Sequence, residues 1–143
     1  MNEIVFLDCT LRDGGYYNSW DFQHDLVQDY LYAISDAGVN VVEIGFRTLD
    51  KKGFKGACAY SSESYINSLQ IPDGLKLCVM INASEIIKNG VYQEGKINQL
   101  FPEKSQNSNI FMVRIASHPH EAREALLACK NLNSKGYKIG FNL

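Results

Sequence analysis

Residues 4–15 read IVFLDCTLRDGG, and this stretch decides the expected fold class. The run Ile4-Val5-Phe6-Leu7 is continuously apolar, which is typical of a strand covered on both faces in a parallel sheet. The pair Gly14-Gly15 then predicts a turn. Arg12 and Asp13 are therefore expected where a buried strand passes into a loop, and in α/β barrels this position belongs to the catalytic face.

Strand and helix patterns alternate along the rest of the chain. Apolar runs predict four further strands, over residues 39–46, 75–82, 110–116 and 137–143. Helical spacing and end signals predict helices over residues 22–37, over 61–69, from Ser84 to a break at Gly90, and from Pro119 to Gly136. The last helix is expected to bury Ala122, Ala125, Leu126, Cys129 and Leu132. Residues 47–60 and 103–109 are predicted loops, and the pattern over 91–100 is ambiguous.

Five strands in strict alternation with four helices predict an α/β fold with parallel strands. This is a little over half of a TIM (β/α)8 barrel, whose usual length is about 250 residues. The last apolar run ends on Leu143, so we expect one domain, residues 1–143, that is the N-terminal portion of a barrel truncated after strand five. The alternative is an open flavodoxin-like parallel sheet, which alternates in the same way.

Composition excludes several classes of function. The 143 residues are 45% hydrophobic with a formal net charge of -2, so the chain can bury a core but offers no strongly basic face for nucleic acid. No apolar run approaches the roughly 20 residues of a membrane helix, and no signal peptide pattern precedes the first strand. The four cysteines form no CxxC pair, which favours reduced thiols in a cytoplasmic protein.

Leu7 to Gly14, followed by Val42-Glu43-Ile44-Gly45, resembles the DRE-TIM metallolyases. That superfamily includes 3-hydroxy-3-methylglutaryl-CoA lyase and isopropylmalate synthase, and the 4-hydroxy-2-oxovalerate aldolase branch is the most similar. The run Val113-Arg114-Ile115-Ala116 gives weaker support. The resemblance implies a divalent-metal-dependent aldolase or lyase that cleaves or forms a C–C bond next to a 2-oxo acid such as pyruvate, through a metal-stabilised enolate.

The resemblance also implies roles for individual residues. The family's motif aspartate ligates the metal and its motif arginine stabilises the enolate oxygen, which assigns Asp13 and Arg12, with Mn2+ or Mg2+ as the expected metal. Glu43 would orient Arg12 or a metal-bound water, and Tyr16 and Arg114 are candidates for substrate binding. Burying Glu43 without compensation is expensive, so Arg12 or Arg114 is expected to pair with it in any case. The structural alternative is an Arg12–Asp13 ion pair that only braces a loop.

Two features depart from the family. The triplet His118-Pro119-His120 follows strand four, whereas the family's metal-binding His-x-His follows strand six, so we interpret the triplet as a helix start and expect the remaining metal ligands beyond Leu143. A histidine follows the motif closely in the aldolase branch, but Gly15, Tyr16 and Tyr17 stand here. Tyrosine, with an ordinary pKa of about 10, is a poor base at neutral pH, so the general base stays unassigned.

On this reading the 143-residue chain is inactive by itself and becomes an enzyme only as part of a full-length protein. The competing hypothesis is a non-catalytic half-barrel that acts as a binding or assembly module. Such a module would cover its exposed sheet edges, most simply as a homodimer. A phosphate-binding flavodoxin-like domain is the third alternative. Neither a nucleic acid nor a membrane is an expected partner.

Overall fold

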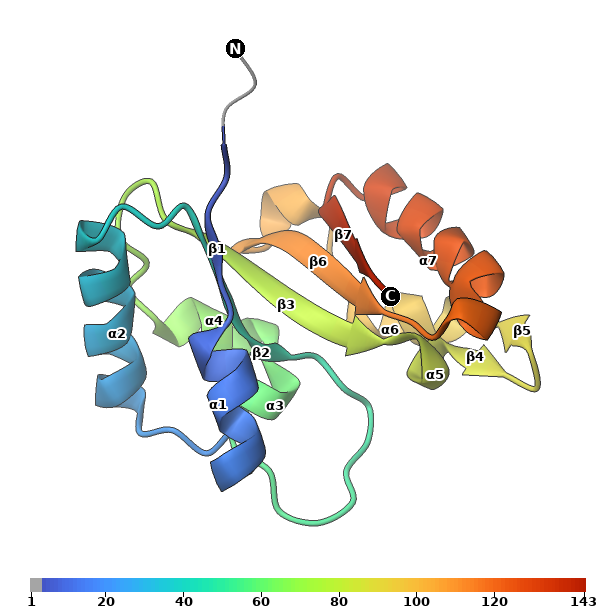
Figure 1. Ribbon diagram of the computed structural model, residues 1–143, viewed down its shortest axis with the longest axis horizontal. Helices are drawn as coiled ribbons and strands as arrows, with labels where there is room; N and C mark the ends of the chain where they lie inside the picture. Colours follow the sequence, from blue (N-terminus) through green and yellow to red (C-terminus); the bar gives the residue numbers. More distant parts are fainter. Residues whose placement is uncertain (1–3) are drawn as a thin grey trace.

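The computed structural model describes residues 4–143, and its centre is a curled sheet (Figure 1). Within these residues the sheet has five strands in the order β1-β2-β3-β6-β7, and every neighbouring pair is parallel. The strands are β1 (Leu7–Asp8), β2 (Val41–Phe46), β3 (Lys76–Asn82), β6 (Ile110–Ala116) and β7 (Lys138–Asn142).

The strand order decides between the two folds that the sequence left open. Doubly wound sheets reverse their strand order at a switch point, whereas a barrel adds each new strand beside the previous one. The main sheet follows the chain without a reversal. The prediction of a partial TIM-barrel fold is therefore confirmed, and the flavodoxin-like alternative is wrong.

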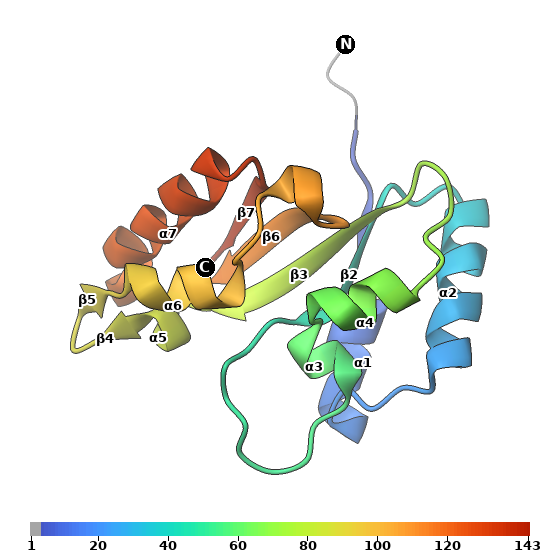
Figure 2. The same cartoon turned by 180° about the vertical axis from the view of Figure 1, so that it is seen from behind.

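Short helices and one hairpin connect the strands. The helices are α1 (Thr10–Asn18), α2 (His24–Asp36), α3 (Ala57–Tyr60), α4 (Glu63–Ser68), α5 (Ala83–Ile86), α6 (Glu94–Leu100) and α7 (Ala122–Ser134), with 3-10 turns η1 (Ser105–Asn107) and η2 (Pro119–Glu121). The strands β4 (Ile87–Lys88) and β5 (Val91–Tyr92) form an antiparallel hairpin. Figure 2 shows α3, α4 and α6 on the near side of the sheet, with α2 and α7 toward its two ends.

The two faces of the sheet carry different chemistry. One face joins the helices in a continuous apolar core that includes Val42, Ile44, Leu77, Val79, Ile81, Val113 and Ile115. Alternate positions on the same strands point the other way, because successive side chains in a strand alternate between faces. These positions hold Glu43, Cys78, Met80, Arg114 and Gly140, which lie outside the apolar cluster. The concave face is therefore where charged groups of the sheet collect.

The first predicted strand is the largest disagreement with the sequence analysis. Only Leu7 and Asp8 pair with β2, and the side chains of Ile4, Val5 and Phe6 are 77%, 55% and 65% exposed. These three residues precede β1, which among residues 4–143 is an edge strand with a neighbour on one side. Continuous apolarity predicted a strand covered on both faces, and that prediction is wrong here.

The glycine pair does not form a turn. Gly14 and Gly15 lie inside α1, which also includes Arg12, Asp13, Tyr16 and Tyr17. The helix begins early because the Asp8 carboxylate accepts hydrogen bonds from the backbone N–H and the hydroxyl of Thr10, both at 2.9 Å. A Cβ on Gly15 would lie 1.9 Å from the Trp20 indole, so this glycine makes room for a side chain.

The remaining predictions agree with the structure within a few residues. The helix predicted over 22–37 is α2, and the one over 61–69 is α4, whose N-cap Ser62 accepts a hydrogen bond from the Tyr65 N–H. The loop over 47–60 ends in α3. The helix predicted from Ser84 to Gly90 is wrong beyond Ile86, because β4 follows there and pairs with β5 as a hairpin, and the ambiguous stretch over 91–100 holds β5 and α6. In α7, Leu126 is 50% exposed, contrary to prediction, and Ala128 is buried in its place.

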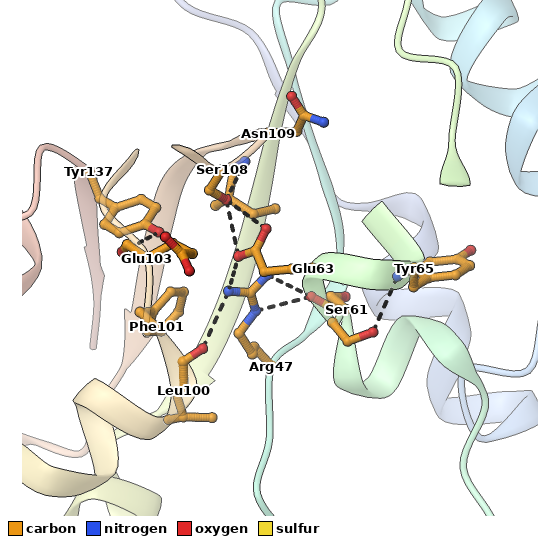
Figure 3. A network of polar contacts seen from close by, with 12 residues as sticks. Arg47, Ser61, Glu63, Tyr65, Leu100, Phe101, Glu103, Ser108, Asn109 and Tyr137 are labelled. Carbon is orange, nitrogen blue, oxygen red and sulfur yellow. Dashed lines mark hydrogen bonds and ion pairs between the residues drawn. The ribbon is translucent and has the colours of Figure 1, made fainter. Parts of the chain in front are cut away.

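Arg47 anchors the loop that follows β2. Its guanidinium is almost fully buried and donates to the Ser61 carbonyl from Nε (3.0 Å) and Nη2 (2.7 Å), and to Glu63 from Nη1 (2.9 Å), as Figure 3 shows. It also bonds the Leu100 carbonyl at 3.3 Å and lies over the Phe101 ring, 4.8 Å from its centroid. This residue, at the start of a predicted functional loop, therefore ties that loop to α4 and α6.

The predictions about membrane helices and cysteine pairs can be compared with the structure of residues 4–143. From residue 4 to residue 143, each helix is too short or too polar to cross a lipid bilayer. The four cysteines, all within that range, carry free thiols; Cys58 and Cys78 are buried and the other two are half-buried.

Candidate active site on the concave face

Glu43, in the middle of β2, is the centre of a buried ion network. Its carboxylate is fully buried and accepts hydrogen bonds from Arg12 Nε (2.7 Å to Oε1) and from Arg114 Nη1 (3.0 Å to Oε1 and 2.9 Å to Oε2). The network joins α1, β2 and β6. The expectation that an arginine compensates Glu43 is confirmed, and both candidates do so, which balances a charge that would otherwise be costly to bury.

Arg12 is held from two sides. Beside its bond to Glu43, its Nη1 lies 2.5 Å from Asp13 Oδ1. Burial by itself would lower the pKa of Arg12, but the hydrogen bond and charge of Glu43 and the charge of Asp13 outweigh it and raise that pKa. Arg12 therefore stays cationic with its side chain 14% exposed, whereas the Asp13 side chain is 62% exposed.

Both guanidinium groups keep donors for a ligand. The Nη2 of Arg12 and the Nη2 of Arg114 have no hydrogen-bond partner among residues 4–143. The Arg114 side chain is 19% exposed. A guanidinium has five N–H donors in a fixed fork, so each can hold Glu43 on one side and an anion on the other.

Two thiols border the network. Cys9 Sγ accepts a hydrogen bond from Arg114 Nη1 at 3.3 Å, and Cys78 Sγ donates to Glu43 Oε2 at 3.7 Å. Burial raises the pKa of both thiols, and the negative charge of Glu43 raises it further. Both groups are therefore thiols rather than thiolates at neutral pH. Sequence reasoning treated them only as reduced thiols, although Cys78 is the register partner of Glu43.

Gly140 leaves the space that the Arg114 side chain occupies on the sheet. The two residues are register partners on β7 and β6, and a Cβ on Gly140 would lie 2.6 Å from Arg114 Cγ. A larger residue there would push the arginine off the strand. The sequence offered a signal for this, since Gly140 interrupts an otherwise apolar strand pattern.

Tyr16 belongs to an aromatic cluster beside Arg12. Its ring packs edge-to-face against Trp20 (centroids 4.8 Å apart) and Phe46 (6.2 Å), and those two rings are 5.3 Å apart. Trp20 Nε1 donates to the Arg12 carbonyl at 2.8 Å, and the Arg12 guanidinium carbon is 6.0 Å from the Phe46 centroid. Tyr16 therefore lies beside the network, and the structure brings all five predicted site residues to one region.

Two hollows open at the carboxyl ends of the strands. One of about 160 Å³ is lined by the aromatic cluster and by Thr48, Asp50, Lys55, Ala59, Asn82 and Glu85. The other, of about 360 Å³, is lined by Asn82, Ser84, Ala116, Ser117, His118, Glu121, Asn142 and Leu143. Asn82 borders both. Sequence reasoning missed it, although its place at the end of a predicted strand is where barrel sites collect their residues.

Asp13 suits part of a metal site. An exposed carboxylate is a hard oxygen ligand of the kind that Mg2+ and Mn2+ prefer. In the part of the chain that the structure describes, however, no three His, Cys, Asp or Glu side chains come together as a metal site. Among the described residues, Asp13 can therefore supply one ligand of such a metal centre.

The triplet His118-Pro119-His120 starts a helical segment, as predicted. Pro119 is the first residue of η2, and the His118 N–H donates to the Glu121 carboxylate at 3.1 Å. The two imidazoles stack in parallel, with centroids 5.6 Å apart.

Comparison with known proteins finds similarity among solved structures. No family model and no curated protein matches the chain. Among solved structures, the chain is similar to the crystal structure of the N-terminal domain of a "putative aldolase" from Bacteroides vulgatus, with a TM-score of 0.84 and 29% sequence identity. The match covers 96% of this chain and 44% of that one, so the chain spans less than half of its neighbour's length. The half-barrel thus resembles the N-terminal part of an aldolase-like protein.

Proposed function

We propose that this chain supplies the Arg12–Asp13–Glu43 part of the active site of a metal-dependent aldolase or lyase in the DRE-TIM superfamily. The reaction makes or breaks a C–C bond next to the carbonyl of a 2-oxo acid such as pyruvate. In the forming direction the 2-oxo acid loses a methyl proton, its enolate carbon bonds to the carbonyl carbon of an acceptor, and the acceptor oxygen takes up a proton. The similarity to an aldolase-like N-terminal domain supports this class of reaction.

The proposal rests on the geometry of Arg12, whose guanidinium has a fixed position and a free N–H donor. Glu43 holds its Nε at 2.7 Å, so the guanidinium is oriented before substrate arrives. Its Nη2 can then donate to the enolate oxygen, whose negative charge develops during the reaction. Glu43 is a positioning residue in this scheme, and its full burial keeps water from competing for Arg12.

Arg114 and Asp13 complete the proposed roles. The free Nη2 of Arg114 is suited to the carboxylate of the 2-oxo acid, since a guanidinium binds carboxylates through parallel N–H bonds. Asp13, exposed at the first turn of α1, would hold Mn2+ or Mg2+ together with ligands from elsewhere in the full protein. When bound, the metal supplies Lewis-acid polarisation of the substrate carbonyl.

The test is exchange of the methyl protons of pyruvate in D2O with Mn2+, followed by mass spectrometry of the pyruvate. It is carried out on the full protein that contains this chain. Arg12→Lys is expected to lower the exchange rate by about 100-fold, the usual effect of losing one oxyanion-stabilising contact. Asp13→Asn is expected to lower it by at least as much, because it weakens the binding of the metal that polarises the carbonyl. Asp73→Asn, an exposed aspartate in the loop before β3, is the matched control.

A purely structural Arg12–Asp13 pair predicts a different result. Asp13→Asn would then lower the melting temperature while leaving proton exchange at the level of the control. That outcome would refute the proposal.

One observation favours the alternative of an assembly module. Apolar side chains are exposed near both edge strands: Ile4, Val5 and Phe6 beside β1, and Phe141 and Leu143 at β7. Such edges favour pairing with a second copy. Sedimentation that gives a monomer at high protein concentration would contradict a homodimer.

A further inference from the structure

We propose that the hollow lined by Tyr16, Trp20 and Phe46 binds the acceptor of the proposed reaction, and that this acceptor is a short, uncharged, hydroxylated aldehyde. The inference rests on the proposed function and adds the substrate class. It follows from the position, the walls, the charge and the size of this hollow.

The position places an acceptor beside the enolate. The hollow shares two of its wall residues with the surroundings of Arg12: Phe46 lies under the guanidinium, and Trp20 donates to the Arg12 carbonyl. Tyr16 follows Arg12 by four residues on α1, so both side chains lie on the same face of that helix. A molecule in the hollow therefore lies next to the group that is proposed to hold the enolate oxygen.

One wall is aromatic. The Trp20 ring stands at 65° to Tyr16 and at 90° to Phe46, so the three rings form a rigid corner. Tyr16 is 64% exposed, which leaves much of its surface free for contact. Aromatic surface of this kind suits the C–H groups of a ligand.

Most of the remaining lining is polar. The Glu85 carboxylate is fixed by the Thr48 hydroxyl and by the Leu49 N–H at 3.3 Å, and it still has lone pairs for a hydroxyl donor. The Asn82 amide has no hydrogen-bond partner among residues 4–143 and can both donate and accept. A ligand that has both C–H groups and hydroxyls matches the aromatic and the polar parts of this lining.

The charge of the lining disfavours an anionic acceptor. Lys55 is the cation of the lining, and it pairs with Asp50 at 2.9 Å. Glu85 adds a second carboxylate, so the lining carries a net charge of about -1 at neutral pH. A phosphate or carboxylate on the acceptor would face this charge, whereas neutral hydroxyls would not.

The volume of the hollow suits a small ligand. The hollow measures about 160 Å³, and a cavity of roughly 150 Å³ accommodates benzene. Six non-hydrogen atoms correspond to a three-carbon hydroxyaldehyde. Glycerol is an unreactive probe of the same size and hydroxyl pattern.

Trp20, the chain's one tryptophan, provides the readout, because its indole N–H gives a single side-chain signal in 1H–15N NMR spectra. The chain is titrated with glycerol, with propan-1-ol as the probe lacking two hydroxyls, and with glycerol 3-phosphate as the anionic probe. Glycerol is expected to bind at least fivefold more tightly than either of the others. Equal affinity for glycerol and propan-1-ol, or a preference for the phosphate, would overturn the inference.

Variants locate the binding site. Asn82→Ala and Glu85→Gln are each expected to weaken glycerol binding by about five- to tenfold, the usual loss for one or two hydrogen bonds to a ligand. Asn82 has no partner to lose, so its replacement keeps the fold even if Glu85→Gln loosens the loop. Asn107→Ala, an exposed residue of η1, is the matched control. Unchanged glycerol affinity in Asn82→Ala would overturn the inference.

The experiments distinguish a failure of the proposed function from a failure of the proposed acceptor site. Methyl-proton exchange of pyruvate requires no acceptor, so it tests the proposed function alone. Exchange without hydroxyl-selective binding would leave the aldolase proposal in place and refute the acceptor. Hydroxyl-selective binding without exchange would support the acceptor site and refute the reaction assigned to it.

Discussion

Replacing Glu43 by Gln removes the carboxylate that lies between the guanidinium groups of Arg12 and Arg114. This substitution is the most direct test of how much the buried ion network stabilises the fold. The variant keeps the shape of the side chain but leaves Arg12 and Arg114 facing each other in a site where their side chains are only 14% and 19% exposed. Breaking a buried pair by neutralising one partner costs about 3 to 5 kcal/mol. Because Arg12 retains Asp13 at 2.5 Å, we expect the lower value, about 3 kcal/mol.

This cost converts to a measurable shift in melting temperature. For 143 residues, an unfolding entropy of about 2.1 cal/mol/K per residue gives roughly 0.3 kcal/mol/K, so 3 kcal/mol corresponds to about 10 °C. Differential scanning calorimetry measures the shift, with the exposed Glu103→Gln as control. The double variant Glu43→Gln/Arg114→Met should recover part of the loss, because it removes the second cation as well. A shift below about 2 °C in Glu43→Gln would refute the view that this network is buried and coupled.

Three further changes test other parts of the structure. Gly140→Ala should cost about 1 to 3 kcal/mol, since its methyl group would overlap Arg114, and thermal unfolding measures the loss. Arg47→Met should cost about 3 kcal/mol, because it leaves the Ser61 carbonyl without its donor and the Glu63 carboxylate with the Ser108 hydroxyl but without its cation, and chemical denaturation should show a lower midpoint at an unchanged slope. Burial and a hydrogen bond to a carboxylate raise the pKa of Tyr30 to about 12, above its ordinary value of 10.0. The unfolded chain therefore loses this proton first, so stability falls as pH rises from 10 toward 12, and Tyr30→Phe should reduce that fall in pH-dependent unfolding.

Apolar runs predicted β2, β3, β6 and β7 well because these strands are covered by neighbours and helices. The same pattern failed at Ile4–Phe6, since apolarity does not reveal whether a strand lies at the edge of the sheet. The glycine pair failed for another reason. Turn propensity is a local property, whereas the requirement at Gly15 comes from the Trp20 ring that packs on it.

The parts of the site that could be predicted are those that follow from a short motif or from the large energetic cost of burying a charge. Burial of a carboxylate in β2 required a cation, so an arginine partner for Glu43 could be expected from the sequence. That Arg114 binds it depends on the register of β2 with β3 and of β3 with β6, and that Arg12 binds it depends on how α1 packs beside β2. No single-sequence pattern contains either arrangement. The hollows depend on the same register, and so Asn82 was missed.

The network at Glu43 also has a consequence for how the chain folds. Its two cations lie 31 and 71 positions away in the sequence, so the carboxylate is neutralised in two separate steps. The nearer contact closes a short loop and can form once β2 pairs with β1, whereas the farther one must wait for β6 and a larger loss of chain entropy. An intermediate that contains only the first strands would bury Glu43 beside a single guanidinium. As the chain leaves the ribosome, β2 is made before β6, and its docking gains full electrostatic compensation only after the β6 arginine has been synthesised and placed.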